Sequence, residues 1–372
     1  MMRWINLAVK IGIPLLVLVG AAWSVHVLWQ AGGFDDPIVT RIDGSCQKVA
    51  GVTGPEDIVI DRERGQAYLS GRDLRAAAAA RDGKGSLPAG AIYRYDLGAA
   101  DGAGPDSAGP VNLTPDMPVS FQPHGLSLLR DGATTWLFVV NHPGGAQHEI
   151  IRYRLAADGL VEDGRFASPL LISPNDIHAV GPERFYVTND RGSGAPFMHA
   201  VESFLRLPRS TVAYRDPGGW RVVADDIVFA NGINGTADGG RILVGSTVEK
   251  RIYLYARDAQ DGALAELARL PLPMGADNIA RDAEGRFWVA GHPRLFDFVG
   301  HAGDAARPSP GMVVRMTLAG EGGEVAEILR EDGTTLSAMS VAAPYGADRL
   351  LLGGVFADYF VDCRISPAAM GK

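Results

Sequence analysis

The chain has 372 residues, including 47 glycines and 23 prolines, and a formal net charge of -8. This length allows one large domain with a core of its own, and the many turn-forming residues suit a fold of many short strands. An acidic chain offers no basic surface to nucleic acid, so we exclude nucleic acid as a partner.

Residues 1–31 are expected to form an apolar helix. The run from Ile11 to Trp29 has about the length that spans a bilayer, and Arg3 and Lys10 lie on the side expected to stay cytoplasmic. A cleaved signal peptide is the alternative, although its apolar region is usually shorter; a buried helix is a third. We expect an exported, membrane-tethered protein on the periplasmic or extracellular face, with secretion after cleavage as the alternative.

After a linker at 32–45, one pattern recurs six times: a short polar cluster, an aliphatic residue, and then an apolar strand. The aliphatic positions lie 46 to 68 residues apart, at Ile58, Leu126, Ile177, Ile233, Ile279 and Val341. Second strands follow most copies, beginning at Ala91, Glu149, Ser210, Arg251 and Met312. Such a period is typical of a radial β-repeat, so we predict an all-β, six-bladed propeller over residues 46–372.

Three insertions interrupt these repeats. Ala76–Ala89 is a long excursion, and the Gly-rich stretch Gly98–Pro110 reads as a loop. Pro196–Leu207 is the one convincing amphipathic helix outside the N-terminal segment. That helix would either cover the mouth of the propeller channel or pack on a blade.

Five of the six copies place a carboxylate, an amide or an imidazole at the same repeat position, so these side chains should converge on the propeller axis. The oxygen donors are Glu56, Asn175, Asn231, Asp277 and Asn278. Hard oxygen donors with two carboxylates suit Ca²⁺ better than zinc or copper. The sixth copy, with Met339 and Ser340, carries no strong ligand.

Asp57 and Asp176 each follow one of those donors. Because neighbouring residues of a strand point to opposite faces, these two would serve a second ion stacked along the axis. Taken singly, an Asp or Asn before a turn is more often only a backbone cap. The metal interpretation therefore depends on the recurrence.

Two histidines are candidate catalytic residues. His124 takes the polar position of the second copy, and His142 ends the next strand. Such a pair would form a dyad in which one imidazole deprotonates water and the other accepts or orients the proton. A zinc site is less favoured because no third His or Cys falls at an inner position. The structural alternative is a hydrogen-bonded histidine at a strand end; His292 is a weaker candidate for the pocket.

Cys46 and Cys363 are the two cysteines and stand near the two ends of the predicted propeller. In an exported protein they can form a disulfide, and a ring-shaped fold brings its chain ends together. Two unrelated buried thiols are the alternative.

At these residues the chain resembles the paraoxonase (arylesterase) family, within the calcium-dependent propellers that include gluconolactonases. The matching segments are GPEDI, QPHGLS, VVNHPGG, PNDIHAVGPERFYVTND, VFANGIN, ADNI, VAGHP and YFVDC. The resemblance spans about Cys46 to Cys363. It implies a propeller that holds two axial calcium ions, one catalytic and one structural, and hydrolyses lactones and aryl esters.

The resemblance also implies site residues. The catalytic ion would be held by Glu56, Asn175, Asn231, Asp277 and Asn278, and the structural ion by Asp57, Asp176 and the backbone carbonyl of Leu126. His124 and His142 match the family's dyad, and Cys46 and Cys363 match its ring-closing disulfide. Gly291 and Arg191 stand where animal members carry cysteine and histidine, which indicates a reshaped pocket. A retained N-terminal anchor is a further family feature.

These features together predict a membrane-tethered, calcium-dependent hydrolase of lactones and aryl esters. The alternative is a noncatalytic propeller that binds a ligand or a protein, with calcium serving stability alone. A metal-free propeller of the strictosidine synthase type would lack these axial ligands.

Overall fold

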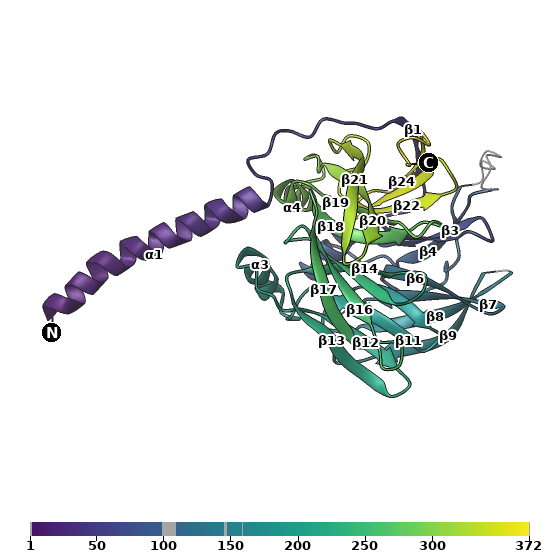
Figure 1. The fold of residues 1–372 in the computed structure, drawn as a ribbon, viewed down its shortest axis with the longest axis horizontal. Coiled ribbons are helices and arrows are strands. Elements are labelled where there is room, and N and C mark those ends of the chain that lie inside the picture. Colours follow the sequence, from purple (N-terminus) through teal and green to yellow (C-terminus); the bar gives the residue numbers. More distant parts are fainter. Residues whose placement is uncertain (1, 99–108, 145–146, 158, 372) are drawn as a thin grey trace.

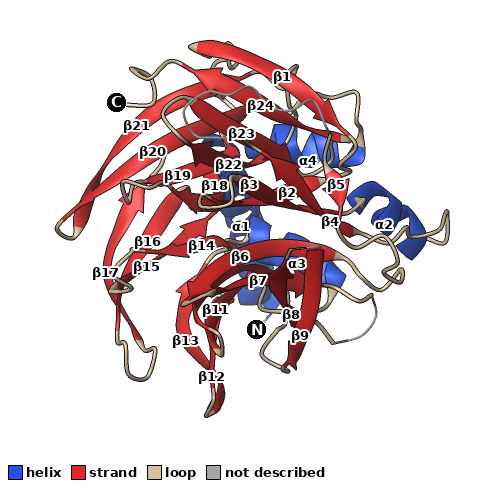
Figure 2. Ribbon diagram, turned by 90° about the vertical axis from the view of Figure 1, so that its right-hand side faces the viewer, coloured by secondary structure: helices blue, strands red, loops and turns tan. Residues whose placement is uncertain are grey.

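The computed structural model describes residues 2–98, 109–144, 147–157 and 159–371. Within them, the strands form six four-stranded sheets around a central axis, and a long helix, α1 (Met2–Gln30), extends away from the sheets (Figures 1 and 2). The inner strands of neighbouring sheets contact one another in a closed ring. The predicted six-bladed β-propeller is confirmed.

Five blades are each built from four consecutive strands, the first of them innermost. Blade one contains β2 (Pro55–Asp61), β3 (Gln66–Gly71), β4 (Ala91–Asp96) and β5 (Val111–Asn112), and blade two contains β6 (Pro123–Asp131), β7 (Thr134–Asn141), β8 (Glu149–Ala156) and β9 (Gly159–Ala167). Blade three contains β10 (Pro174–Gly181), β11 (Arg184–Asn189), β12 (Ser210–Asp216) and β13 (Gly219–Ile227). Blade four contains β14 (Ala230–Gly235), β15 (Arg241–Ser246), β16 (Arg251–Arg257) and β17 (Leu264–Pro271), and blade five β18 (Gly275–Arg281), β19 (Phe287–His292), β20 (Gly311–Ala319) and β21 (Gly322–Glu331).

The sixth blade joins the two ends of the propeller. Its strands β22 (Met339–Tyr345), β23 (Arg349–Gly354) and β24 (Tyr359–Ile365) are completed by β1 (Gly44–Ala50), which pairs antiparallel with β24. Cys46 lies directly opposite Cys363 in this pairing, and the two form a disulfide. The predicted bridge is confirmed, and it fastens the strand pair that closes the ring.

The hydrophobic core consists of six clusters, and each lies between two neighbouring blades. Between blades five and six, for example, Trp288 and Val313 pack with Leu350 and Val361, all of them at most 1% exposed. Because blades are covered on both faces, strands such as β15 and β23 carry apolar residues at successive positions. The burial of these faces holds the inner strands around the axis.

In the part of the chain that the structure describes, three short helices lie on the propeller in addition to α1: α2 (Leu74–Arg81), α3 (Pro196–Phe204) and α4 (Leu295–Gly303). Helix α3 confirms the helix predicted there but ends earlier, since Arg206 adopts a positive φ of 52°. The prediction of one helix outside the N-terminal segment was wrong. Asp73 caps α2 by accepting a hydrogen bond from the Ala76 N–H. Helix α2 thus overlaps the start of the stretch predicted as a long excursion, Ala76–Ala89. Most of the Gly98–Pro110 loop lies outside the described residues.

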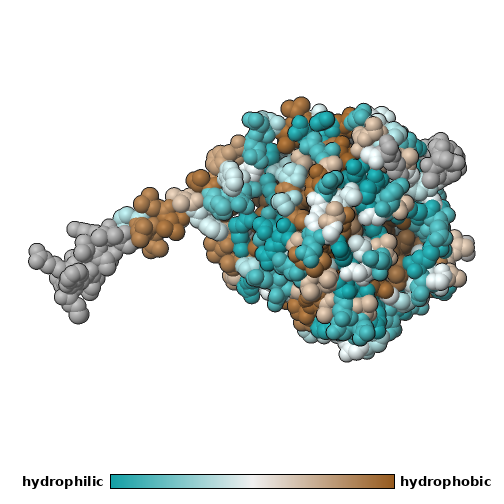
Figure 3. Space-filling view, in the orientation of Figure 1, coloured by the Kyte–Doolittle hydropathy of each residue, from teal (hydrophilic) through white to brown (hydrophobic). Residues whose placement is uncertain are grey.

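Helix α1 is exposed over its apolar part. Residues Ile13–Gln30 have a mean hydropathy of 1.6 and the length of a membrane span or signal sequence. Figure 3 shows their apolar surface projecting from the propeller. The end of α1 nearer the propeller contacts the two helices there: Trp23 Nε1 donates to the carbonyl of Phe204 (3.0 Å), and the Leu295 N–H donates to the carbonyl of Ala31 (2.9 Å).

Candidate active site

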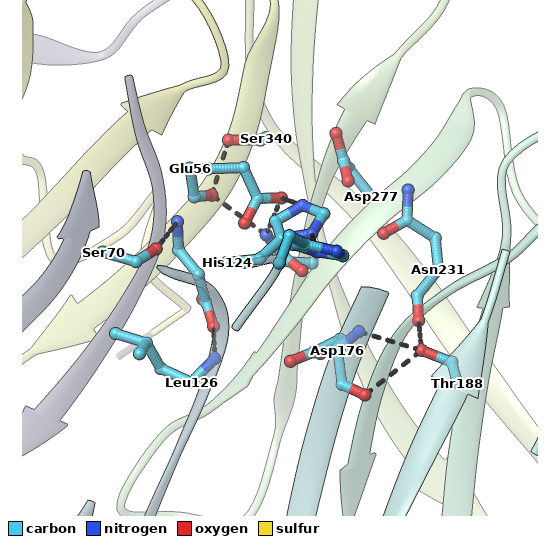
Figure 4. A network of polar contacts seen from close by, with 12 residues as sticks. Glu56, Ser70, His124, Leu126, Asp176, Thr188, Asn231, Asp277 and Ser340 are labelled. Carbon is cyan, nitrogen blue, oxygen red and sulfur yellow. Dashed lines mark hydrogen bonds and ion pairs between the residues drawn. The ribbon is translucent and has the colours of Figure 1, made fainter. Parts of the chain in front are cut away.

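The six polar clusters lie at β-bulges on the inner strands of the six blades. In blade one, the paired residues on either side of the bulge leave Glu56 and Asp57 opposite the single residue Ser70. The register shifts at the equivalent place in the other five inner strands. A bulge redirects side chains and is common beside active sites. Figure 4 shows the result around His124, where polar side chains from several blades gather at the axis.

Two glycines allow neighbouring bulges to approach closely. A Cβ atom on Gly125 would lie 2.5 Å from the carbonyl oxygen of Asn175, and one on Gly232 would lie 2.4 Å from that of Asp277. Real Cβ atoms do not tolerate such distances. The repeats that read His-Gly-Leu and Asn-Gly-Ile therefore need glycine to bring the polar groups of adjacent blades together.

Glu56 is the centre of a group of polar side chains at the axis and is 3% exposed. The Asn278 side-chain amide donates to the Glu56 Oε1 atom (2.9 Å) and to its main-chain oxygen (3.0 Å), which also accepts a hydrogen bond from Ser340 Oγ (2.7 Å). His124 Nε2 lies 3.4 Å from Glu56 Oε1. Residues from blades two, five and six thus meet at Glu56 of blade one, those from blades two and five at its carboxylate.

Four oxygens around this centre are buried without a hydrogen-bond partner within the described chain. They are Glu56 Oε2, Asn175 Oδ1, Asn231 Oδ1 and Asn278 Oδ1. An unsatisfied buried polar atom costs about 1–3 kcal/mol, so four at one place call for a missing partner. All four belong to the five predicted calcium ligands; the fifth, Asp277, contacts His292 Nε2 at 2.9 Å.

The buried carboxylates at the axis also indicate a cation site. Burial raises the pKa of Glu56 to about 7 and also raises that of Asp277. Burial and the neighbouring Glu56 raise the pKa of Asp57 to about 8, and burial beside Asp57 raises that of Asp176 well above its ordinary value. Such shifts mean that buried carboxylates lack compensating positive charge. This donor set fits a divalent cation.

No group of three or more His, Cys, Asp or Glu residues is placed to hold a metal within the described ranges. Three of the five predicted calcium ligands are asparagines, which are not among these four residue types. Amide oxygens are ordinary ligands for calcium and poor ones for softer metals.

Asp57 and Asp176 tie adjacent blades together. Each carboxylate accepts one hydrogen bond from the N–H of the next residue and one from the following blade. The cross-blade donors are the Leu126 N–H to Asp57 (2.7 Å) and the Ile233 N–H to Asp176 (2.8 Å). These residues line a cavity of about 150 Å³. The structure shows their backbone-binding role; the role in holding an ion remains a prediction.

The two predicted catalytic histidines are in direct contact. His124 Nδ1 lies 3.0 Å from Nε2 of His142, which follows the end of β7. A third imidazole, which the sequence analysis did not select, extends the pair: Nδ1 of His148 lies 3.1 Å from Nδ1 of His142. Burial and the charge of Arg72 lower the pKa of His124 to about 3 and that of His142 well below its usual value. Both rings are therefore neutral near pH 7.

Gly291 and Arg191 are the two positions that depart from the family pattern, and the structure shows what surrounds each. A Cβ atom on Gly291 would lie 1.9 Å from the carbonyl oxygen of Gly275, so no larger residue fits there without a backbone shift. The Arg191 guanidinium stacks 3.9 Å above the ring of Phe229. The weaker candidate His292 is 1% exposed and pairs with Asp277.

Comparison with known proteins gives the family. The family model described as arylesterase matches residues 87–363. The chain belongs to the arylesterase family. Serum paraoxonase/arylesterase 1 from Rattus norvegicus is 36% identical over 244 residues, which cover 64% of this chain and 67% of the rat protein. Family membership makes this propeller an enzyme that hydrolyses esters or lactones.

Two solved structures share the fold at low identity. A putative gluconolactonase aligns with a TM-score of 0.52 and 16% identity, covering 88% of this chain and 98% of its own. A calcium-binding protein, regucalcin from Agrobacterium tumefaciens, aligns with a TM-score of 0.50 and 14% identity, covering 88% and 96%. At these identities the likeness concerns the fold.

Proposed function

We propose that the protein is a calcium-dependent hydrolase of lactones and aryl esters. The observation that carries the proposal is the group of four buried, unpartnered oxygens beside His124 in the described structure. A binding site for a cation next to a neutral imidazole is the arrangement that ester hydrolysis by activated water requires. The rat relative named paraoxonase/arylesterase and the gluconolactonase fold support this substrate class.

The residues divide between two ions, one catalytic and one structural. Glu56, Asn175, Asn231, Asp277 and Asn278 would hold the catalytic ion, and Asp57, Asp176 and the Leu126 carbonyl would hold the structural one. Bound calcium supplies a Lewis acid for the substrate carbonyl and for the negative charge that develops on its oxygen. The fold shared with regucalcin, a calcium-binding protein, supports this choice of metal.

The protein's own part in the reaction belongs to the histidines. His124 Nε2 faces Glu56 Oε1 at the axis, while its Nδ1 is held by His142. A neutral His124 takes a proton from water at Nε2, and the contact with His142 fixes the ring and shares the charge. His124 is therefore the general base of the dyad, and His142 accepts or orients the proton at His124 Nδ1.

We also propose that the enzyme is exported and tethered to a membrane by α1. The support is the exposed 18-residue apolar stretch and the contacts of Trp23 and Ala31 with the helices at the propeller surface. The serum location in the name of the rat relative agrees with export. Cleavage after export is the alternative, and the mass of the mature protein in a membrane fraction distinguishes the two.

The function is tested with a panel of lactones of graded chain length and a phenyl ester, assayed in calcium and in saturating EGTA. We expect turnover that EGTA abolishes and added Ca²⁺ restores; turnover that is unchanged in EGTA would refute the calcium proposal. The paired variants are Glu56→Gln, expected to weaken calcium binding, and His124→Gln, expected to lose turnover while keeping calcium. A wild-type protein that binds calcium but hydrolyses no substrate of the panel would favour the noncatalytic binding propeller.

A further inference from the structure

The histidine pair continues into a third ring. The contacts run from His124 Nδ1 to His142 Nε2 (3.0 Å) and from His142 Nδ1 to His148 Nδ1 (3.1 Å). The rings of His142 and His148 are 4.8 Å apart and nearly perpendicular, at 82°. All four ring nitrogens that make these contacts lie within hydrogen-bond distance of a neighbour. Three imidazoles therefore form one chain.

The chain leads from the axis toward the surface. His124 is 9% exposed, whereas His148 is half-buried and directly precedes β8 in blade two. Its Nδ1 makes the contact with His142, and no hydrogen bond of its Nε2 occurs within the described residues. A proton that enters the chain at the axis can thus leave it in a part of the molecule that solvent reaches.

We propose that His148 is the exit of a three-histidine proton relay that serves the hydrolytic site; this inference rests on the proposed function. In the resting state His124 Nδ1–H donates to His142 Nε2, and His142 Nδ1–H donates to His148 Nδ1. His148 carries its proton on Nε2, and His124 Nε2 is free to act as the base.

The transfer balances without any other reactant. As His124 Nε2 takes one proton from water, the Nδ1 proton of His124 moves to His142 Nε2, and the Nδ1 proton of His142 moves to His148 Nδ1. His148 Nε2 then releases one proton to solvent. The three rings are neutral before and after, and the proton now on His124 Nε2 is in place for the leaving alkoxide or phenoxide. When His124 Nε2 gives this proton to the leaving group, the protons between the three rings move back to His124 Nδ1 and His142 Nδ1. His148 Nε2 then regains one proton from solvent, which restores the resting state.

The surroundings of His148 suit this exit. Burial and the charge of Arg72 lower the pKa of His148, and Asp190 opposes that effect. Arg72 follows β3 and Asp190 follows β11, so charged groups of both signs from the neighbouring blades act on the ring. A ring with a lowered pKa does not hold a second proton near pH 7, which favours release over storage.

Two variants of the full-length protein separate conduction from positioning. His148→Ala removes the ring, and His148→Asn keeps a hydrogen-bonding amide near the Nδ1 position without a group that conducts protons. We expect each to lower kcat by about 10-fold with little change in KM, and small buffers or added imidazole to restore the rate. His199→Ala is the matched control, since His199 is a half-buried histidine that contacts only the carbonyl of Ser193 among the contacts of the described chain; it should keep the wild-type rate.

The outcomes are decisive either way. A His148→Asn variant with wild-type kcat and no response to buffer would show that His148 only positions His142, and would overturn the relay. A wild-type protein that turns over no lactone or ester would instead refute the proposed function. In that case ¹⁵N spectra of imidazole-labelled full chain still test the relay: shared-proton signals between His142 and His148 support it, and separate tautomers with no hydrogen bond overturn it.

Discussion

The Asn278 amide of blade five donates to the side chain and to the main chain of Glu56 in blade one, at 2.9 and 3.0 Å. These two bonds leave the Glu56 Oε2 and Asn278 Oδ1 atoms buried and unpartnered among the described residues. The contact orients two oxygens from different blades toward one place at the axis, and it fixes them before any ion binds. Preorganisation of this kind raises the affinity of a cation site.

Asn278→Ala should weaken calcium binding by at least about 10-fold, because it removes one oxygen and releases another. Isothermal titration of the calcium-free protein measures the effect. The matched control is Asn234→Ala: its amide also bridges two blades, donating to the Ile279 carbonyl, but its own oxygen already accepts a hydrogen bond from Gly235. Equal loss of affinity in the two variants would contradict the assignment of Asn278 as a ligand.

Gly125→Ala should disrupt the contact between blades two and three. The added methyl would meet the Asn175 carbonyl at 2.5 Å, so we expect a loss of about 1–3 kcal/mol in the free energy of unfolding together with weaker calcium binding. Gly194→Ala, where the structure has no heavy atom within 4 Å of the new Cβ among the described residues, is the control. Unfolding in urea measures both, and an unchanged Gly125→Ala protein would refute the close approach of the blades.

The double variant Cys46→Ser, Cys363→Ser should lose several kcal/mol of stability. The bridge spans 317 residues, and loop-closure entropy sets an upper bound of about 5–6 kcal/mol for its contribution. Urea unfolding with and without a reducing agent measures the loss. The reducing agent should not change the free energy of unfolding of the variant. If it also left that of the wild type unchanged, the disulfide would not stabilise the ring.

Stability should fall as the pH rises from about 5 to 8, in part through Glu331. Burial raises the pKa of Glu331 to about 7, so its contribution is fully present below the unfolded pKa of 4.5 and is lost as the pH passes the folded value. Glu331→Gln keeps an oxygen for the Gly333 N–H and should flatten this dependence by up to about 3 kcal/mol. Glu324→Gln, an exposed glutamate of the same strand, is the matched control. An identical slope in the wild type and Glu331→Gln would refute the assignment.

The sequence alone predicted the blades and the gathering of polar side chains at the axis, because both depend on a periodic pattern. In each of the six copies, the polar cluster marks an inner strand, and the apolar run after it marks the second strand of the blade. The same pattern placed Glu56, His124 and Asn278 at one axis. It could not show that Asn278 bonds to Glu56, since the contact joins residues 222 positions apart.

Features outside the repeat were missed for a physical reason. His148 lies in a connection before β8, where no period marks it, and its contact with His142 is visible only in the folded structure. Helix α2 begins in an alanine-rich stretch that has no apolar face, and α4 follows a strand end without a side-chain cap. Such elements form through contacts with the finished propeller and leave little local signal.

The most direct test of the calcium proposal is the number of calcium ions that each chain binds. Purified protein is stripped with EGTA, returned to buffered calcium, and measured by isothermal titration and by elemental analysis. We predict two ions per chain in the wild type and the loss of one in Glu56→Gln, with lactone turnover falling in parallel. A wild type that binds no calcium yet hydrolyses lactones would contradict the assignment of the axial oxygens.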